Sequence, residues 1–581
     1  MQKKISDVTF MLCLALTCAG DAAAQPVAQP DASASGTPSM VIVNGRVMTP
    51  DGFQQAVAIE NGVITAVGTS AEVSGLAGDE TQVLDAQGGA VLPGLHDLHV
   101  HSIGGGMTQT ACGFSRAASP DEIRQAVSGC VAQRADGEWI QGGSWIANVF
   151  ADGQQTKEFL DEVAPNNPVI LMDESYHSSW VNSAALEAAG VTAATSDPVN
   201  GRIERGPDGE PTGILRESAM GLVSRFMPPP TKEAMAKGAQ IAGNLMLSYG
   251  VTSYTDAGLD PVSMQVLSDA TRSGDVKLRI RGCMSWNPNS PDGGATGLAM
   301  IASRHDYATD RFTPDCVKTG LDGVPTESHT AAMLEPYAHS NETGMNSIAP
   351  ETLFPSIIDF DRQGLHVKFH AAGDAAVRNA INAIEAARTA NGTGGPFHDV
   401  AHASFVSPDD VARVTELNAS WEFSPYIWYP STITRDIVEA IGPERMERWI
   451  PIADALEADG LVGAGSDWAV VPSIDPWLAI ETMVTRQLPG GSDEALGAGQ
   501  AITLEQALRI FTLNGAKIMR QSDKVGTIEP GKFADIFVTH QDPFAIPVTE
   551  LHNVEVRWTF VEGELAYDSE TPPASLEGVN R

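Results

Sequence analysis

The chain of 581 residues is long enough for one large domain with a satellite, or for several small domains. Hydrophobic residues make up 43% and charged residues 19% of it, a balance that excludes an intrinsically disordered protein. With 73 acidic and 36 basic residues the net charge is -37, so the surface repels phosphate backbones and anionic lipids, and we expect no nucleic-acid partner.

The first element in chain order is a predicted secretory signal over residues 1–24. It has a basic start at 1–4, a short apolar run at 8–19 and small residues at 22–24, which are the three parts of a cleaved signal. We therefore expect a periplasmic or secreted protein. No later apolar run reaches about 18 residues, so we expect no membrane contact once the signal is removed. Residues 25–38 are small, polar and Pro-rich, which predicts a flexible leader.

Short β-rich runs follow at residues 39–93 and recur near the other end of the chain at 520–568. In the first segment, Asn44-Gly45 and Asn61-Gly62 are hairpin dipeptides between runs of apolar residues. Because both segments consist of short β-rich runs separated by turns, we predict that the two chain ends build one small β-sandwich domain. Residues 569–581 would then be a tail.

Between these segments, residues 94–519 alternate strand-like apolar runs with amphipathic helices, which is typical of parallel β/α units. Ser119 and Thr503 each stand at the N-cap of a predicted helix, with an acid or amide three residues later. The pattern predicts an α/β fold, a (β/α)8 TIM barrel. The segment is longer than the roughly 250 residues of a typical barrel, so it must hold insertions, and the Gly- and Pro-rich stretch 197–217 is one candidate.

Four of the six cysteines remain after signal removal: Cys112, Cys130, Cys283 and Cys316. In an oxidising compartment they can form two disulfides. Three pairings exist, and the sequence does not choose among them; Cys112–Cys130 with Cys283–Cys316 is our working hypothesis. No cysteine or histidine spacing typical of structural zinc is present, so we expect no such site.

Polar residues stand at the ends of several predicted strands. His99 and His101 end the run AVLPGLHDLHVH, and residues i and i+2 of a strand share a face. Imidazoles converging from one strand suit a divalent metal such as zinc, although two barrel histidines without a metal would explain this pair equally well. His370, His402 and Asp467 also follow strand-like runs, at the end of the strands where barrel active sites gather. Together these positions predict a shared metal site.

Over residues 40–567 the chain resembles the amidohydrolase superfamily, in its amidohydrolase-3 branch. The matching stretches are PGLHDLHVHSIGGG, GEWIQGGSW, NPVILMDESYHSSWVNSAAL, GEPTGILRESA, GVTSYTDAG, VKTGLDGVPTESHTAAMLEPY, FHAAGDAAV, VAHASFVSP, GSDWAV and VGTIEPGKFADIFV. Their combined specificity is high, while each piece alone is only moderately specific. The resemblance implies a metal-dependent hydrolase with its active site at the mouth of the barrel.

The resemblance further implies a site for one or two divalent ions, with zinc expected. The ligands would stand on the first, fifth, sixth and eighth barrel strands and are His99, His101, His370, His402 and Asp467. Lys318 resembles the family's bridging lysine, which is carbamylated if two ions are bound. That reaction requires its pKa to fall below the usual value near ~10.4. Lys368 lies two residues before His370 on the same strand face, where it could compete with Lys318 or pair with an acid at the barrel base.

By the same resemblance, His177 would contact the substrate and polarise its carbonyl oxygen, with bracing of a loop as the alternative. Tryptophans near the presumed rim suggest an apolar or aryl substrate group, although each one alone is more often a core residue. The candidates are Trp145, Trp180, Trp428 and Trp468, with Trp421 at the start of an aromatic stretch, 421–431, that we predict to form a wall or lid of the pocket.

The reaction that these expectations favour is hydrolysis of an amide-type C–N bond in an N-acyl or N-aryl amide. A divalent ion can lower the pKa of bound water from ~15.7 to ~7, so metal-activated hydroxide would attack the carbonyl. Asp467 would carry the proton to the leaving nitrogen. Ester or lactone hydrolysis, or metal-assisted isomerisation, would use the same barrel and ligands. A secreted binding protein is less favoured, because it has no reason to keep buried charges near a metal. The expected partner is a small-molecule substrate, and a homo-oligomer is left open.

Overall fold

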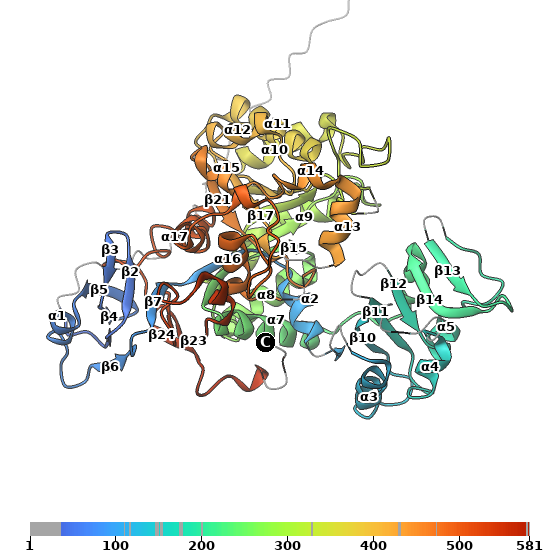
Figure 1. The fold of residues 1–581 in the computed structure, drawn as a ribbon, viewed down its shortest axis with the longest axis horizontal. Helices are drawn as coiled ribbons and strands as arrows, with labels where there is room; N and C mark the ends of the chain where they lie inside the picture. The colour runs from blue at the N-terminus through green and yellow to red at the C-terminus, as the bar shows by residue number, and fades with distance from the viewer. Residues whose placement is uncertain are drawn as a thin grey trace, which may run out of the picture.

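The computed structural model describes residues 36–109, 111–114, 118–145, 150, 155–173, 178–198, 201–326, 329–427, 432–471, 473–576 and 579. The predicted signal and nearly all of the predicted leader lie outside these residues. Figure 1 shows a central barrel with its helices, an inserted unit in teal on one side, and small sheets in blue and dark red on the other.

The central sheet has eight strands in the order β21-β20-β19-β18-β17-β16-β15-β8, and every pair is parallel. The strands are β8 (Leu95–Val100), β15 (Val251–Leu259), β16 (Arg279–Ser285), β17 (Phe312–Gly320), β18 (His366–Ala371), β19 (Asp399–His402), β20 (Ser420–Phe423) and β21 (Leu461–Ala464). The chain beyond β21 returns to β8, where Asp467 N–H donates to the carbonyl of His99 at 2.7 Å. The predicted α/β fold with an eight-stranded barrel is confirmed.

Helices cover the outside of the barrel. The longest are α7 (Lys232–Ser248), α8 (Pro261–Ser273), α10 (Pro350–Arg362) and α11 (Asp374–Asn391). Thr503 caps α17 (Leu504–Arg509), and its side chain and that of Gln506 form the predicted capping box. Among the described residues, none of the helices is both long and apolar enough to cross a lipid bilayer.

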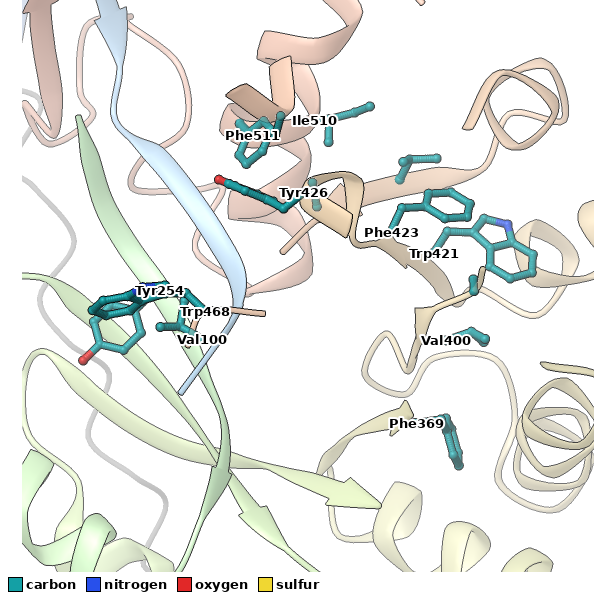
Figure 2. Packing of buried hydrophobic residues seen from close by; sticks show 14 of the residues in the cluster. Val100, Tyr254, Phe369, Val400, Trp421, Phe423, Tyr426, Trp468, Ile510 and Phe511 are labelled. Carbon is teal, nitrogen blue, oxygen red and sulfur yellow. The ribbon is translucent and has the colours of Figure 1, made fainter. Parts of the chain in front are cut away.

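Strand alternation separates the apolar outer face of the barrel from a polar inner face. On β20, the rings of Trp421 and Phe423 stack 5.9 Å apart within the hydrophobic core, as Figure 2 shows. Glu422 between them therefore projects from the opposite face, into the barrel. On β18, Phe369 is likewise a core residue. Its neighbours in the sequence, Lys368 and His370, are therefore also directed into the barrel.

After β8, the helix α2 (Ser102–Thr108) packs against α7, and the chain between these two helices forms an inserted unit with its own six-stranded sheet, in the order β13-β14-β12-β11-β10-β9. Its strands are β9 (Cys112–Gly113), β10 (Ile140–Trp145), β11 (Val169–Asp173), β12 (Ser178–Val181), β13 (Gly201–Arg205) and β14 (Pro211–Glu217), accompanied by α3 (Pro120–Val131), α4 (Lys157–Asp161) and α5 (Ser183–Ala189). The predicted insertion at 197–217 is only the β13–β14 hairpin of this unit. The rest of the unit alternates strands and helices as the barrel does, so the sequence pattern alone does not separate the two.

Two further sheets lie beside the barrel. One has the order β5-β4-β1-β6 and contains β1 (Met40–Val43), β4 (Ala56–Glu60), β5 (Val63–Gly68) and β6 (Gln82–Asp85). The other joins both chain ends and contains β24 (Glu564–Asp568), β23 (Val556–Val561), β22 (Ile536–Thr539), β7 (Ala90–Pro93), β2 (Arg46–Thr49) and β3 (Gly52–Gln54). Ile42, Val57 and Ile536 belong to one apolar cluster shared by the two sheets. The prediction that the two chain ends share a sheet is confirmed.

Both disulfides of the working hypothesis are present. Cys112–Cys130 joins β9 to α3 in the inserted unit. Cys283–Cys316 joins the neighbouring barrel strands β16 and β17, where the two cysteines are paired in register and fully buried. The second disulfide therefore lies on the same strand as Lys318.

Removing the barrel disulfide is expected to destabilise the protein. The bond joins residues 33 positions apart. By the loop-entropy model, a cross-link of this span restricts the unfolded chain, and its removal should lower the free energy of unfolding by about 3 to 4 kcal/mol. We would compare the Cys283→Ala/Cys316→Ala variant with the native sequence by urea unfolding, after thiol titration of the denatured protein shows that the bond forms. A loss below about 1 kcal/mol would contradict the expectation.

Candidate metal centre

The six side chains predicted as metal ligands come together at the carboxyl ends of the barrel strands. His99 is near the end of β8 and His101 directly follows that strand; Lys318 is on β17 and His370 on β18. His402 is the last residue of β19, and Asp467 follows β21. These are the first, fourth, fifth, sixth and eighth strands of the barrel in chain order. Residues separated by as many as 368 positions thus share one end of one barrel.

His99, His101 and Asp467 form the closest group, and each offers a ligand atom within 4.8 Å of the other two. His101 Nε2 lies 3.4 Å and His99 Nε2 lies 3.6 Å from the same oxygen, Oδ1 of Asp467. Two imidazole nitrogens and a carboxylate oxygen in this arrangement are typical of a site for zinc or a similar divalent ion.

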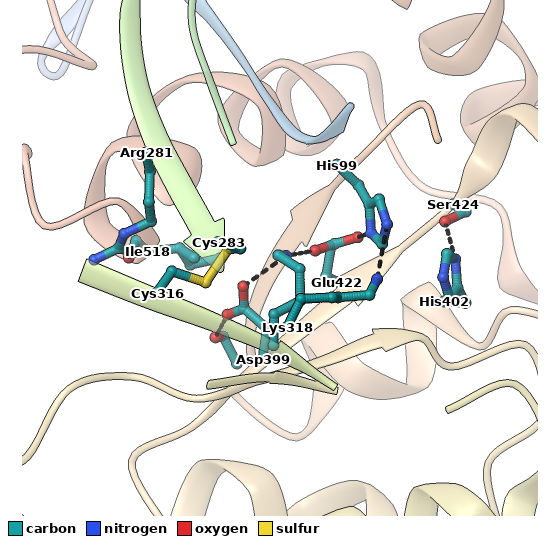
Figure 3. Close-up of polar contacts among 12 residues, drawn as sticks. His99, Arg281, Cys283, Cys316, Lys318, Asp399, His402, Glu422, Ser424 and Ile518 are labelled. Atoms are coloured by element: carbon teal, nitrogen blue, oxygen red, sulfur yellow. Dashed lines mark hydrogen bonds and ion pairs between the residues drawn. A yellow bond between two sulfur atoms is a disulfide. The ribbon is translucent and has the colours of Figure 1, made fainter. Parts of the chain in front are cut away.

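His402, His370 and Lys318 extend this group. The His402 ring lies 4.6 Å from that of His99 and 4.5 Å from that of His370, measured between ring centroids. Lys318 Nζ lies 2.9 Å from Nε2 of His99 (Figure 3). The Nδ1 atom of His402 contacts the hydroxyl of Ser424 at 2.9 Å, which leaves Nε2 as the nitrogen available to a cation.

The backbone at two of these positions has an uncommon conformation. His402 has φ 68° and Asp467 has φ 60°, in the left-handed region that residues other than glycine rarely adopt. The Asp467 conformation is held by the hydrogen bond from its N–H to His99 and by a second one, 2.6 Å long, from His101 N–H to the carbonyl of Trp468. Backbone strain of this kind clusters at functional sites.

Burial lowers the pKa of the histidines in the site. The pKa of His370 falls to about 4, first through burial and then through the charge of Lys318. Burial also takes the pKa values of His99 and His402 well below the ordinary range. The same cause, followed by the charge of Lys368, lowers the pKa of Lys318 to about 7. Neutral imidazoles are the form that binds metals, so the histidines are ready as ligands.

Lys368, which the sequence left as a competitor of Lys318, is engaged elsewhere. It is fully buried, and its Nζ pairs with Asp399 at 2.9 Å and with Glu422. Lys318, by contrast, forms no salt bridge within the part of the chain that the structure describes. Sequence reasoning missed Glu422 and Asp399 themselves. The available signal was an acid on the inner face of an otherwise apolar strand, in WEF and DVAH.

Three of the tryptophans predicted to line the pocket, Trp145, Trp180 and Trp468, are buried core residues. Trp145 and Trp180 are 3% and 0% exposed, pack in the core of the inserted unit, and donate their indole N–H groups to the carbonyls of Leu171 and Thr156. Trp468 is 2% exposed and belongs to the barrel core. These three rings lie in the core and not at the predicted rim, because burying their large apolar surface stabilises the fold.

The described part of the aromatic stretch 421–431 also packs in the core instead of forming the predicted wall or lid of the pocket. Trp421 is fully buried in the core around the barrel, as is Tyr426 at 4% exposure. Trp428 and His177 lie outside the described residues, so their predicted contacts with the substrate stay predictions. Among the candidate ligands, the side chains of His101 and His370 are partly exposed, at 39% and 24%.

The sequence also matches a known protein family, and the match agrees with a group of candidate metal ligands at the mouth of a TIM-like barrel. The pattern of the Amidohydrolase family (Amidohydro_3) matches residues 82–567, which include every barrel strand. The chain belongs to this family. It is accordingly an amidohydrolase in the broad sense of the family.

Three relatives match nearly the whole chain. The protein LONG AFTER FAR-RED 3 of Arabidopsis thaliana is 29% identical over 544 residues, covering 91% of each chain. The putative amidohydrolase YtcJ of Bacillus subtilis (strain 168) is 28% identical and covers 88% of this chain and 96% of its own length. The N-substituted formamide deformylase of Arthrobacter pascens is 26% identical, with 91% and 98% covered.

Solved structures share the fold. Uncharacterized metal-dependent hydrolases from Pyrococcus horikoshii OT3 and Pyrococcus furiosus have TM-scores of 0.70 and 0.68, each with 22% sequence identity. They cover 88% and 87% of this chain, and 99% of each of those chains is matched. The barrel and the sheets beside it are therefore an arrangement already seen in metal-dependent hydrolases.

Proposed function

We propose that this protein hydrolyses the amide-type C–N bond of a small N-acyl or N-aryl compound. The observation that carries the proposal is the convergence of His99, His101 and Asp467, with further imidazoles and Lys318, at the open end of the barrel. The relative named N-substituted formamide deformylase supports the choice of bond, since the chain covers 98% of its length. We also propose export, which the two disulfides support because such bonds persist in oxidising compartments.

The residues present fit a divalent cation. Imidazole nitrogens and a carboxylate oxygen are the donors that zinc prefers, and the lowered pKa values keep the buried imidazoles neutral. His99, His101 and Asp467 would hold one ion. His370, His402 and a carbamylated Lys318 would complete a second. When bound, such an ion supplies Lewis acidity and makes water acidic enough to yield hydroxide near neutral pH.

Asp467 is the group of this chain that can move a proton during the reaction. Its carboxylate is 11% exposed, and one oxygen lies close to both His99 and His101. In the proposed reaction, that carboxylate accepts a proton from the attacking water and returns it to the leaving nitrogen, so the products are a carboxylic acid and an amine. The partly exposed rings of His101 and His370 border the space in which the carbonyl group would sit.

Activity assays on the purified mature protein test this function. The panel contains N-acyl aromatic amines, N-substituted formamides and the matching esters, each with and without a chelator. We expect amine release that the chelator abolishes and added Zn²⁺ restores. Turnover of esters or lactones alone would replace the amide proposal by the alternative hydrolase activity. Binding of panel compounds without product would favour a binding protein.

A further inference from the structure

A buried carboxylate–lysine pair lies directly beneath His99. Glu422 on β20 is fully buried, and its Oε1 lies 2.7 Å from Nδ1 of His99 (Figure 3). Its other oxygen, Oε2, contacts Nζ of Lys368, which also pairs with Asp399 at 2.9 Å. Asp399 is in turn within 2.9 Å of Nε2 of His366. The carboxylate of Glu422 therefore bridges a predicted metal ligand and a buried cation.

The two nitrogens of the His99 ring face different surroundings. Nε2 faces the candidate metal centre, 2.9 Å from Lys318 Nζ and 3.6 Å from Asp467 Oδ1. Nδ1 faces only the carboxylate of Glu422 among its described contacts, and a carboxylate only accepts hydrogen bonds when ionised. Nδ1 must therefore carry the ring proton of a neutral His99, which leaves the lone pair on Nε2.

Lys368 determines which oxygen of the Glu422 carboxylate is left to contact His99. An ammonium group donates hydrogen bonds and cannot accept them, so it requires an acceptor oxygen at Oε2. With Oε2 taken by Lys368, Oε1 is the oxygen left for His99. The pair is sealed from water, because both side chains are fully buried. In such a place an unmet hydrogen bond or an uncompensated charge is costly.

We propose that Glu422, oriented by Lys368, is a positioning residue that holds His99 with its Nε2 lone pair directed at the cation. The proposal rests on the metal centre of the proposed function and adds two residues that do not touch the cation. Outer partners of metal-bound histidines generally fix the tautomer and ring orientation, and their loss weakens metal binding about 10- to 100-fold.

A second buried triad of the same chemistry provides a control. Asp361 at the end of α10 accepts from Arg388 and lies 3.0 Å from Nε2 of His398, and all three residues are at most 5% exposed. His398 precedes β19, at the opposite end of that strand from His402. Changing Asp361 therefore disturbs a carboxylate between a cation and a histidine, without touching the metal centre.

The test compares Co²⁺ binding by the native protein, Glu422→Gln and Asp361→Asn, prepared without metal. In Glu422→Gln the amide oxygen is drawn to Lys368, so the amide NH₂ faces Nδ1 of His99 and favours the tautomer with the proton on Nε2. We expect its Kd for Co²⁺ to rise about 10- to 100-fold, with an altered visible Co²⁺ spectrum. Asp361→Asn should lower the melting temperature and leave the Kd and the spectrum unchanged.

Two further variants sharpen the result. In Lys368→Met/Glu422→Gln the amide can turn its oxygen back to His99, so metal affinity should recover toward the native value. Glu422→Asp keeps the charge pair but shortens the side chain by one methylene, and it replaces Glu422→Gln if that variant does not fold; it too should bind Co²⁺ more weakly.

Native Co²⁺ affinity and spectrum in the folded Glu422 variants would overturn the proposal, and so would equal weakening by Asp361→Asn. If the native protein itself fails to bind Co²⁺ or Zn²⁺, the metal centre of the proposed function fails first, so the two failures are distinguishable.

Discussion

Asp467→Asn is expected to lower kcat for the amide substrate about 10²- to 10⁴-fold, the range that a positioned proton carrier supplies. Asparagine is nearly isosteric with aspartate and tolerates the left-handed backbone that Asp467 adopts at φ 60°. The fold and the hydrogen bond from residue 467 to His99 should therefore survive. What is lost is a carboxylate that can take a proton from water and give it to the leaving nitrogen.

The matched control for this variant is Asp459→Asn. Asp459 also has a left-handed backbone, φ 54°, and it precedes β21, so it lies at the other end of the same strand and is exposed. Steady-state kinetics on the best amide of the panel, with the metal content of each preparation measured, gives the comparison. A kcat within about threefold of the native value for Asp467→Asn would remove this residue from the proton transfer.

Lys318→Met is expected to reduce the bound metal from two ions per chain to one and to lower kcat/KM about 100-fold or more. An ion that stabilises developing charge contributes several kcal/mol, and each ~1.4 kcal/mol is a factor of ten. Lys318 Nζ lies 2.9 Å from Nε2 of His99, among the candidate ligands of the metal centre. Its amine would react with carbon dioxide to give a carbamate and a proton, which replaces a repelled ammonium by an anionic ligand.

Metal analysis with and without bicarbonate tests the role of Lys318. We expect the native protein to take up the second ion only with bicarbonate, and Lys318→Met to hold one ion in both conditions. Lys277→Met is the control, because Lys277 precedes β16 and so lies at the opposite end of the barrel. Two ions in Lys318→Met would show that Lys318 is no ligand, and one ion in the native protein with bicarbonate would show that it stays unmodified.

Much of this site could be predicted because strand geometry is local. The i and i+2 rule puts His99 and His101 at one end of β8, and capping residues such as Ser119 and Thr503 mark where helices begin. The family motifs then order the remaining ligands along the barrel. Trp145, Trp180 and Trp468 lie buried instead of at the predicted rim, since a tryptophan carries no local signal that tells a core from a pocket wall.

The sequence by itself determined the barrel, the sheet shared by the chain ends and the identity of the candidate ligands, because periodicity and motif order depend on near neighbours along the chain. Only the tertiary structure decided between the two inward lysines. Lys368 on β18 meets Asp399 on the adjacent strand β19 and Glu422 on β20, and Lys318 meets His99 instead. That choice depends on which side chains face each other inside the barrel, and these contacts join residues 31, 54 and 219 positions apart, beyond the reach of local sequence patterns.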